Sequence, residues 1–241
     1  MRINYKLVLS VFLLIISGVI FKVIHHGVNI HSGIIKGIDV SHYQGKIIWK
    51  SVDTDDIKFS IAKASGGVSY IDPDFNVNWN GMKEQSLIRG AYHFFYPQDD
   101  PVKQANNYLK VVGTFQPKDL PPIVDVEVTG EKDTDAIVTG LLQWLTTVEK
   151  ATKRRPMIYS DLDFAQQYLS DPRLRDYPLW IAEYSDVVKT LPKPWQSQGW
   201  TIWQYSQTGE VAGIDGDVDL DQFKGSKKEL KAFIKSTHLT H

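Results

Sequence analysis

The chain has 241 residues, of which 42% are hydrophobic and 12% aromatic. This is enough for one sizeable globular core and too little for two. The formal net charge is −1, so no bulk electrostatic attraction favours nucleic acid, and we exclude it as a partner. Cysteine is absent, which excludes a disulfide framework, a thiolate nucleophile and a cysteine-based zinc site.

The N-terminus has the pattern of an export signal. Arg2 and Lys6 precede an uninterrupted apolar run over residues 7–21, and Lys22 follows it. Signal-peptide cores span ~7–15 residues and membrane helices ~17–25, so length alone fits either. No Ala-x-Ala-like cleavage site follows, and Lys22 can extend to the interface, which lengthens the span to residue 24. We therefore favour a retained signal anchor, with a cleaved signal peptide as the alternative. Both send the remaining chain across a membrane, either anchored and facing the cell wall or periplasm, or secreted.

After a short polar connector, apolar segments rich in β-branched residues recur along the chain. Eight of them predict strands, at 36–40, 59–64, 89–95, 122–128, 156–160, 179–184, 201–206 and 217–220. Helical spacing of apolar residues, Pro101 in a first turn and Asp161 as an N-cap predict helices at 101–112, 134–152 and 161–169. A short amphipathic helix is expected in the C-terminal tail.

This order of elements predicts the fold class. Strands that alternate with helices indicate an α/β fold with a parallel sheet, and eight strands in one domain indicate a closed, TIM-like β/α barrel. The last three strands have short connections without clear helical pattern. We therefore expect an irregular barrel that is poor in helices near its end.

The segment "PIVDVEV" at residues 122–128 places two acids inside an apolar strand. Because strand side chains alternate between faces, Asp125 and Glu127 share a face with Ile123, while the three valines line the other. In a barrel the acid face points inward near the carboxyl end, where barrel enzymes carry their chemistry. Desolvation and mutual repulsion there raise the pKa of at least one acid, as a general acid requires. The alternative is an edge strand with a wet acidic face, which Pro121 and Pro122 could mark.

Other predicted strands also carry acids at their ends. Asp39 lies in the first strand, and "GDVDLDQF" puts Asp217, Asp219 and Asp221 on one face of the last. Singly, such residues are more often caps or turn residues than catalysts. In a closed barrel, however, the first, fourth and last strands are neighbours or near-neighbours, so these acids are expected to converge.

Aromatic residues crowd the same strand ends. Sugar rings stack their apolar faces on aromatic side chains and donate hydroxyl hydrogen bonds to acids and amides, so an acidic cleft with aromatic walls suits an oligosaccharide. Core packing is the alternative, and Phe95 and Trp203 are candidates for it. The candidate substrate-binding residues are Tyr43, Tyr92, Phe94, Tyr159, Trp180, Tyr184 and Gln204; for Gln204 a buried structural amide is equally compatible.

Seven segments together resemble one known family. "GIDVSHYQG", "GAYHFFYP", "PIVDVEV", "PMIYS", "LWIAEY", "TIWQYS" and "GDVDLDQF", in this order, look like glycoside hydrolase family 25, the Chalaropsis or cellosyl type of lysozyme. The resemblance covers about residues 34–225. This sequence departs from the family in its N-terminal apolar segment and in having no appended cell-wall-binding repeats.

The resemblance implies an irregular barrel that cleaves the β-1,4 bond between N-acetylmuramic acid and N-acetylglucosamine in peptidoglycan strands. It implies Glu127 as proton donor, Asp125 as its partner, and Asp39 and Asp219 as residues that position sugar and water; Asp217 is the fallback for Asp219. It implies no cofactor and no metal, and we expect a monomer. The implied organisation is a basic N-terminus at 1–6, a signal anchor or signal peptide at 7–24, a connector at 25–33, the catalytic barrel at 34–225 and a helical tail at 226–241.

Two routes remain open for the second catalytic group. Asp125 could attack the anomeric carbon, or it could orient the 2-acetamido group of the substrate, whose oxygen then closes on that carbon. The Cα atoms of two acids two residues apart on a strand are ~6.5–7 Å apart in both cases. The resemblance favours substrate assistance with retention of configuration.

Three rival functions remain from the sequence. A carboxylate-lined barrel could hold Mg²⁺ or Mn²⁺ for sugar isomerisation, although only His42 and His93 lie near strand ends as further ligands. The chain could hydrolyse chitin or another N-acetylhexosamine glycan. It could also be a non-catalytic glycan-binding protein, against which the complete acid set argues.

Overall fold

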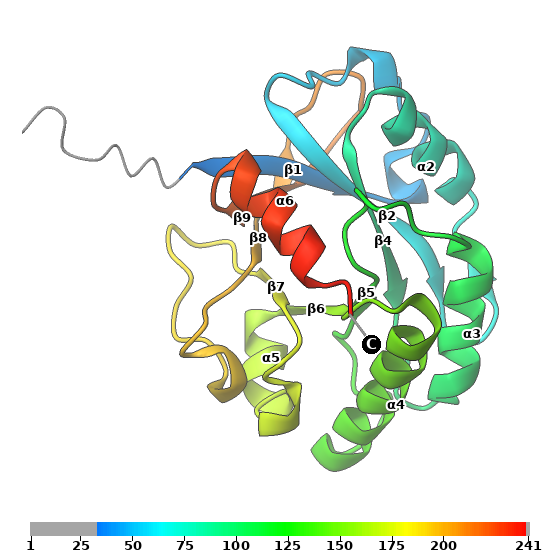
Figure 1. Ribbon diagram of the computed structural model, residues 1–241, viewed down its shortest axis with the longest axis vertical. Coiled ribbons are helices and arrows are strands. Elements are labelled where there is room, and N and C mark those ends of the chain that lie inside the picture. The colour runs from blue at the N-terminus through cyan, green and yellow to red at the C-terminus, as the bar shows by residue number, and fades with distance from the viewer. Residues whose placement is uncertain (1–32, 240–241) are drawn as a thin grey trace, which may run out of the picture. The chain divides into compact units, whose positions relative to one another are not determined.

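The structure is a computed structural model that describes residues 33–239 (Figure 1). The predicted basic N-terminus and signal segment lie outside the described residues, as does the connector apart from Gly33. Within residues 33–239, none of the helices combines the length and apolar character that crossing a membrane requires.

Eight strands close into a barrel, as expected. Their order around it is β1-β9-β8-β7-β6-β5-β4-β2, and β2 pairs with β1 to close the circle. A ninth, β3, pairs antiparallel with the end of β2 outside the barrel. The strands are β1 (Ile34–Val40), β2 (Ile57–Gly66), β3 (Tyr70–Ile71), β4 (Ile88–Phe94), β5 (Ile123–Asp125), β6 (Met157–Asp161), β7 (Leu179–Ala182), β8 (Ile202–Gly209) and β9 (Val218–Lys224).

The sheet is mixed, which corrects the expectation of a parallel one. Seven barrel strands run parallel, whereas β9 is antiparallel to both its neighbours, β8 and β1. Only residues 210–217 connect β8 to β9. A parallel crossover needs about a dozen residues or more, so this short connection forces the chain to turn back on itself.

Within residues 33–239 the barrel has five α-helices, of which four connect strands between β3 and β7 and one follows β9. They are α2 (Phe75–Glu84), α3 (Pro101–Val112), α4 (Thr134–Thr152), α5 (Leu162–Tyr168) and α6 (Lys227–Ser236). The three helices predicted between strands are present, and α2 is an addition that the sequence pattern did not reveal. Between β7 and β8 there is only a 3-10 turn, Lys193–Trp195, so the expected scarcity of helices near the end of the barrel is confirmed.

Strand alternation divides the apolar residues between two cores. Val124 and Val126 belong to the core between the barrel and its helices, together with Leu141 and Trp144 of α4. Ile123 faces the other way, into the barrel interior. The interior core also contains Phe59, Ile61, Met157, Trp180, Ile202 and Phe223. The alternation read from "PIVDVEV" is therefore confirmed.

Helix α6 closes the amino-terminal end of the barrel. Its Leu230 and Ile234 join the interior core, where they meet residues from the first positions of parallel strands, such as Met157 and Ile202. Figure 1 shows α6 (red) crossing in front of the strands. A capping box at Ser226 and Glu229 fixes where the helix begins. With its amino-terminal end filled by α6, the barrel interior is open to a site at its carboxyl end.

We expect Leu230→Ala to destabilise the fold by about 2–5 kcal/mol, the usual loss for truncating a fully buried leucine. Chemical denaturation followed by circular dichroism measures this. Lys231→Ala, on the exposed side of the same helix, is the matched control. Equal stability of the two variants would contradict the role of α6 as part of the interior core.

Candidate active site

A cavity of about 270 Å³ opens at the carboxyl end of the barrel. Acids, aromatic side chains and amides from strands far apart in the sequence form its walls. They are Asp39, Tyr92, Asp125, Glu127, Tyr159, Trp180, Tyr184, Gln204, Gln207 and Asp219. All four acids that we predicted from the sequence to be catalytic therefore line the same cavity.

The acid pair lies in the middle of the sheet. Strand β5 pairs with β4 on one side and β6 on the other, so the alternative of an edge strand is wrong. β5 ends at Asp125, but Val126 continues along β6: its N–H donates to the carbonyl of Tyr159 at 2.9 Å, and its carbonyl accepts from Ser160 Oγ at 2.7 Å. This extended backbone turns Glu127 into the same cavity as Asp125.

The second acid group comes from β1 and β9. Asp39 and Asp219 are directly paired across these antiparallel strands, and Asp219 reaches the carboxyl end of the barrel because β9 runs in reverse. Side chains that face each other in this way lie close together. Asp221, two residues further along β9, is fully buried and accepts a hydrogen bond from Trp180 Nε1 at 2.8 Å. Asp217, the fallback, is exposed and lies outside the cavity walls.

Burial raises the pKa of both acids in the β5 pair. For Asp125 burial is the largest cause, repulsion from Glu127 adds to it, and the ammonium of Lys63 opposes it, so that the pKa lies well above its ordinary range. For Glu127 burial again leads, and the negative charge of Asp161 adds to it. Two carboxyl groups this close share their titration, so the pair retains a proton to higher pH than an isolated acid.

The β1 and β9 acids are also shifted upward. Burial raises the pKa of Asp219 to about 6. Burial, followed by repulsion from Asp219, raises the pKa of Asp39 well above its usual value, while a hydrogen bond from Gln204 works in the opposite direction. Burial and the charge of Asp39 do the same to Asp221. The cavity is therefore a place where negative charge is costly and protons are held.

Gln204 forms hydrogen bonds with one of the acids and with two phenol groups. Its Nε2 donates to Asp39 Oδ2 at 2.7 Å, while its Oε1 accepts from the hydroxyls of Tyr159 at 3.0 Å and Tyr184 at 2.7 Å. The two phenols fix which end of the amide faces the acid. Gln204 is a buried, hydrogen-bonded amide that also lines the cavity, so its role in binding substrate stays a prediction.

The expected substrate-binding residues divide into two groups. Tyr92, Tyr159, Trp180, Tyr184 and Gln204 line the cavity. Tyr43 and Phe94 do not. The Tyr43 side chain is exposed beyond the cavity, and the Phe94 ring packs 5.0 Å from that of Tyr96.

Comparison with known proteins agrees with this geometry. Residues 38–214 match the family described as Glycosyl hydrolases family 25. The chain belongs to this family. The match ends before β9, so the placement of Asp219 and Asp221 in this family 25 barrel comes from the fold itself.

Several known proteins are similar to this chain over most of their length. The chain is 37% identical to the uncharacterized protein YegX of Escherichia coli (strain K12), over 83% of this chain and 73% of that one. It is 31% identical to Lysozyme M1 of Streptomyces globisporus, over 84% and 72%. The crystal structure of the bacterial lysozyme from Streptomyces coelicolor superposes with a TM-score of 0.78 at 31% identity, covering 84% of this chain and 98% of that one.

The sequence analysis missed two residues of the site, Lys63 and Gln207. Lys63 follows Phe59 and Ile61 on the inward face of β2, so alternation could have identified it as a cation at the mouth of the barrel. Asp221 was placed correctly on the face of Asp219 but was given no catalytic role. Gln207 gives no such signal, because the register between β8 and β9 shifts on both sides of Ser206.

The raised pKa values make a prediction about stability. A group whose pKa rises from 3.8 in the unfolded chain to about 6 in the folded protein contributes stability that is fully present below the lower value and lost as pH rises through the higher one. The Asp219→Asn variant has no ionisable group at this position, so it does not lose this stability as the pH rises. We therefore expect the variant to melt at a higher temperature than the parent at pH 7.5, with a much smaller difference at pH 3.5.

Thermal melts at the two pH values measure this difference. Asp217→Asn is the matched control, because Asp217 is exposed just ahead of the same strand, and it should show no such pH dependence. A gain for Asp219→Asn that is the same at both pH values would contradict the assignment.

Proposed function

We propose that this chain is a lysozyme-type N-acetylmuramidase, which hydrolyses the β-1,4 bond between N-acetylmuramic acid and N-acetylglucosamine in peptidoglycan. The observation that carries the proposal is the Asp125 and Glu127 pair, which shares one proton-holding cavity at the carboxyl end of a family 25 barrel. The likeness to Lysozyme M1 and to the Streptomyces coelicolor lysozyme supports the same substrate.

Glu127 is the proton donor in this proposal. Glycoside cleavage needs an acid that protonates the leaving oxygen while positive charge develops at the anomeric carbon. An ordinary glutamic acid is ionised at neutral pH and has no proton to give. Burial raises the pKa of Glu127, and this side chain is less enclosed than Asp125, so it is the member of the pair that can hold a proton and reach the substrate.

Asp125 orients the 2-acetamido group of the substrate. Its Oδ1 is buried and has no hydrogen-bond partner within residues 33–239. A buried acceptor without a donor is unfavourable, and the acetamido N–H is a donor that would satisfy it. That hydrogen bond would also favour the ionised form of Asp125, which leaves the shared proton on Glu127. The acetamido oxygen can then close on the anomeric carbon, and water reopens the ring with retention of configuration.

The remaining groups position sugar and water. Asp39, held by Gln204, and Asp219 lie on the opposite wall from the β5 pair and are placed to hold the attacking water and sugar hydroxyls. Tyr92, which is only partly buried, offers a ring face to a pyranose, and the buried rings of Tyr159 and Trp180, whose centroids lie 4.4 Å apart, support the cavity wall beside it. Lys63 partly offsets the negative charge on Asp125 and Glu127. No metal or cofactor enters this scheme.

The location of the enzyme follows from the same substrate. We propose that the chain acts outside the cytoplasmic membrane as a monomer, held by residues 7–24 as an uncleaved anchor, or secreted if they are removed. The apolar run with its preceding basic residues supports export. N-terminal sequencing of the mature protein distinguishes the two, because a cleaved signal gives a chain that begins near residues 22–30.

Glu127→Gln should lower turnover of peptidoglycan by about 10²- to 10⁴-fold, the usual contribution of a positioned general acid. Its melting temperature at neutral pH should be at least that of the parent, because the change removes a buried group that is destabilising when ionised. Release of new reducing ends from purified cell walls measures the rate.

The exposed Glu210, which does not line the catalytic cavity, supplies the control variant Glu210→Gln, which should remain fully active. If the folded Glu127→Gln protein works at nearly the parental rate, Glu127 is not the acid.

A further inference from the structure

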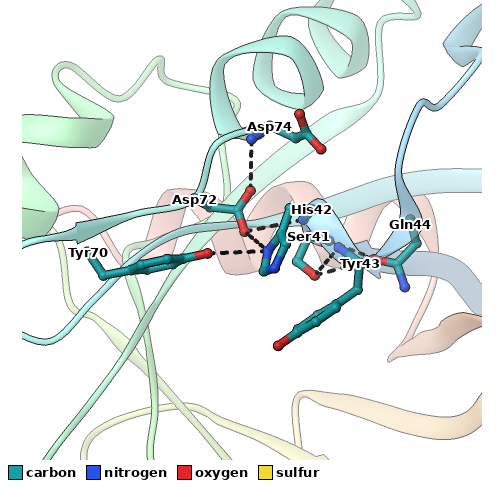
Figure 2. A network of polar contacts seen from close by, with 7 residues as sticks. All are labelled: Ser41, His42, Tyr43, Gln44, Tyr70, Asp72 and Asp74. Carbon is teal, nitrogen blue, oxygen red and sulfur yellow. Dashed lines mark hydrogen bonds and ion pairs between the residues drawn. The ribbon is translucent and has the colours of Figure 1, made fainter.

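Beside the cavity, a buried carboxylate connects two chain segments through hydrogen bonds. Asp72, which follows β3, has a fully buried side chain. Its Oδ2 accepts from the backbone N–H of His42 at 3.2 Å and lies 2.7 Å from His42 Nδ1, while its Oδ1 accepts from the N–H of Asp74 at 3.0 Å (Figure 2). The Tyr70 hydroxyl lies 3.3 Å from the same ring nitrogen. The segment after β1 is thereby held against the segment around β3.

A second set of bonds holds the backbone of Tyr43. Ser41 Oγ accepts from the N–H of Tyr43 at 3.2 Å, and Gln44 Oε1 accepts from the N–H of Ser41 at 2.8 Å (Figure 2). Gln44 Nε2 also donates to the carbonyl of Asp217 at 3.3 Å, which joins this turn to the segment that leads into β9. The short turn is therefore fixed from both sides.

This fixed base supports exposed aromatic rings. Tyr43 is 80% exposed and Tyr70 is 43% exposed. The rings of His42 and Tyr43 lie 4.1 Å apart, and those of His42 and Tyr70 lie 6.3 Å apart. Exposed apolar surface is unfavourable in water, and a group of such rings on a rigid base is characteristic of a binding surface. We call His42, Tyr43 and Tyr70 the outer platform.

The outer platform is continuous with the cavity. The ammonium of Lys63 lies 5.9 Å from the ring centroid of Tyr92, a cavity wall, and 6.0 Å from that of Tyr70. His42 is three residues beyond the cavity acid Asp39, so their Cα atoms are at most ~11 Å apart. A polymer that enters the cavity near Asp39 therefore passes next to the platform.

We propose that the outer platform is a sugar-binding subsite, which stacks a pyranose ring of the glycan strand outside the cavity that holds the cleaved bond. Pyranose rings have an apolar face that fits a tyrosine ring, and their hydroxyls can bond to the Tyr70 hydroxyl and the His42 ring. This inference rests on the proposed function, because the strand in the cavity supplies the sugar. Asp72 is a positioning residue in it, and Tyr43 carries the largest contact.

The test compares long glycan strands with the shortest glycan fragment that the parent hydrolyses, using the full chain. Tyr43→Ala should lower kcat/KM on long strands about 3- to 10-fold through a higher KM, as expected for the loss of one aromatic stacking contact. The kcat at saturation and the kcat/KM on the short fragment should not change. Tyr43→Phe should keep the parental values, because it keeps the ring. Asp72→Asn should show the same selective loss on long strands.

Ile34→Ala is the control, because Ile34 is an exposed apolar residue at the opposite end of β1, and it should behave as the parent. If Tyr43→Ala left KM on long strands unchanged, the outer platform would not be a sugar-binding subsite. An equal loss of kcat/KM on long strands and on the short fragment would also contradict the proposal.

Binding separates this inference from the proposed function. In the Glu127→Gln background, the Kd for long strands of N-acetylated glycan should rise about 3- to 10-fold when Tyr43→Ala is added. A parent chain that cleaves neither substrate would contradict the muramidase assignment, while the same rise in Kd would still support the platform. No rise in Kd would overturn the platform whatever the activity.

Discussion

The accumulation of buried carboxyl groups around one cavity is the constraint on which this molecule depends. Asp39, Asp125, Glu127, Asp219 and Asp221 all have pKa values raised by burial and, for several of them, by one another. These carboxylates would repel one another strongly if all were ionised. The site therefore keeps, near neutral pH, protons that isolated acids would already have lost. The feature that makes the cavity unfavourable for charge also makes it suitable for acid catalysis, which links the stability of the fold to its proposed chemistry.

The barrel makes this concentration of acids tolerable. A closed sheet has no edge, and its two cores, one inside and one beneath the helices, hold each strand on both faces. The reversal of β9 brings Asp219 and Asp221 to the end where the parallel strands finish. Around the acids, the Gln204 amide, the Trp180 indole and the Lys63 ammonium supply partial or full positive charge. Proton storage and precise placement of the acids thus come from the same framework.

Much of this arrangement was predictable because strand alternation is a strong local signal. It placed Asp125 and Glu127 on the inner face, and the order of the motifs predicted a barrel that loses its helices toward the end. The direction of β9 was missed, although the predicted strands at 201–206 and 217–220 leave too few residues between them for a parallel crossover, and the pairing of β9 with β1 has no local signal. Helix α2 was missed because its apolar residues are few and Val77 is exposed. The network around Asp72 joins residues 30 apart in sequence, so no local pattern contains it.

The central claim is that the Asp125 and Glu127 pair cleaves muramic acid linkages with retention. Early-time proton NMR of a digest of purified peptidoglycan, followed by borohydride reduction and mass analysis, tests it most directly. A retaining muramidase gives first products with the β configuration at the new reducing end, and reduction converts that end to muramitol. First products with the α configuration would contradict retention, and glucosaminitol in place of muramitol would contradict the proposed bond.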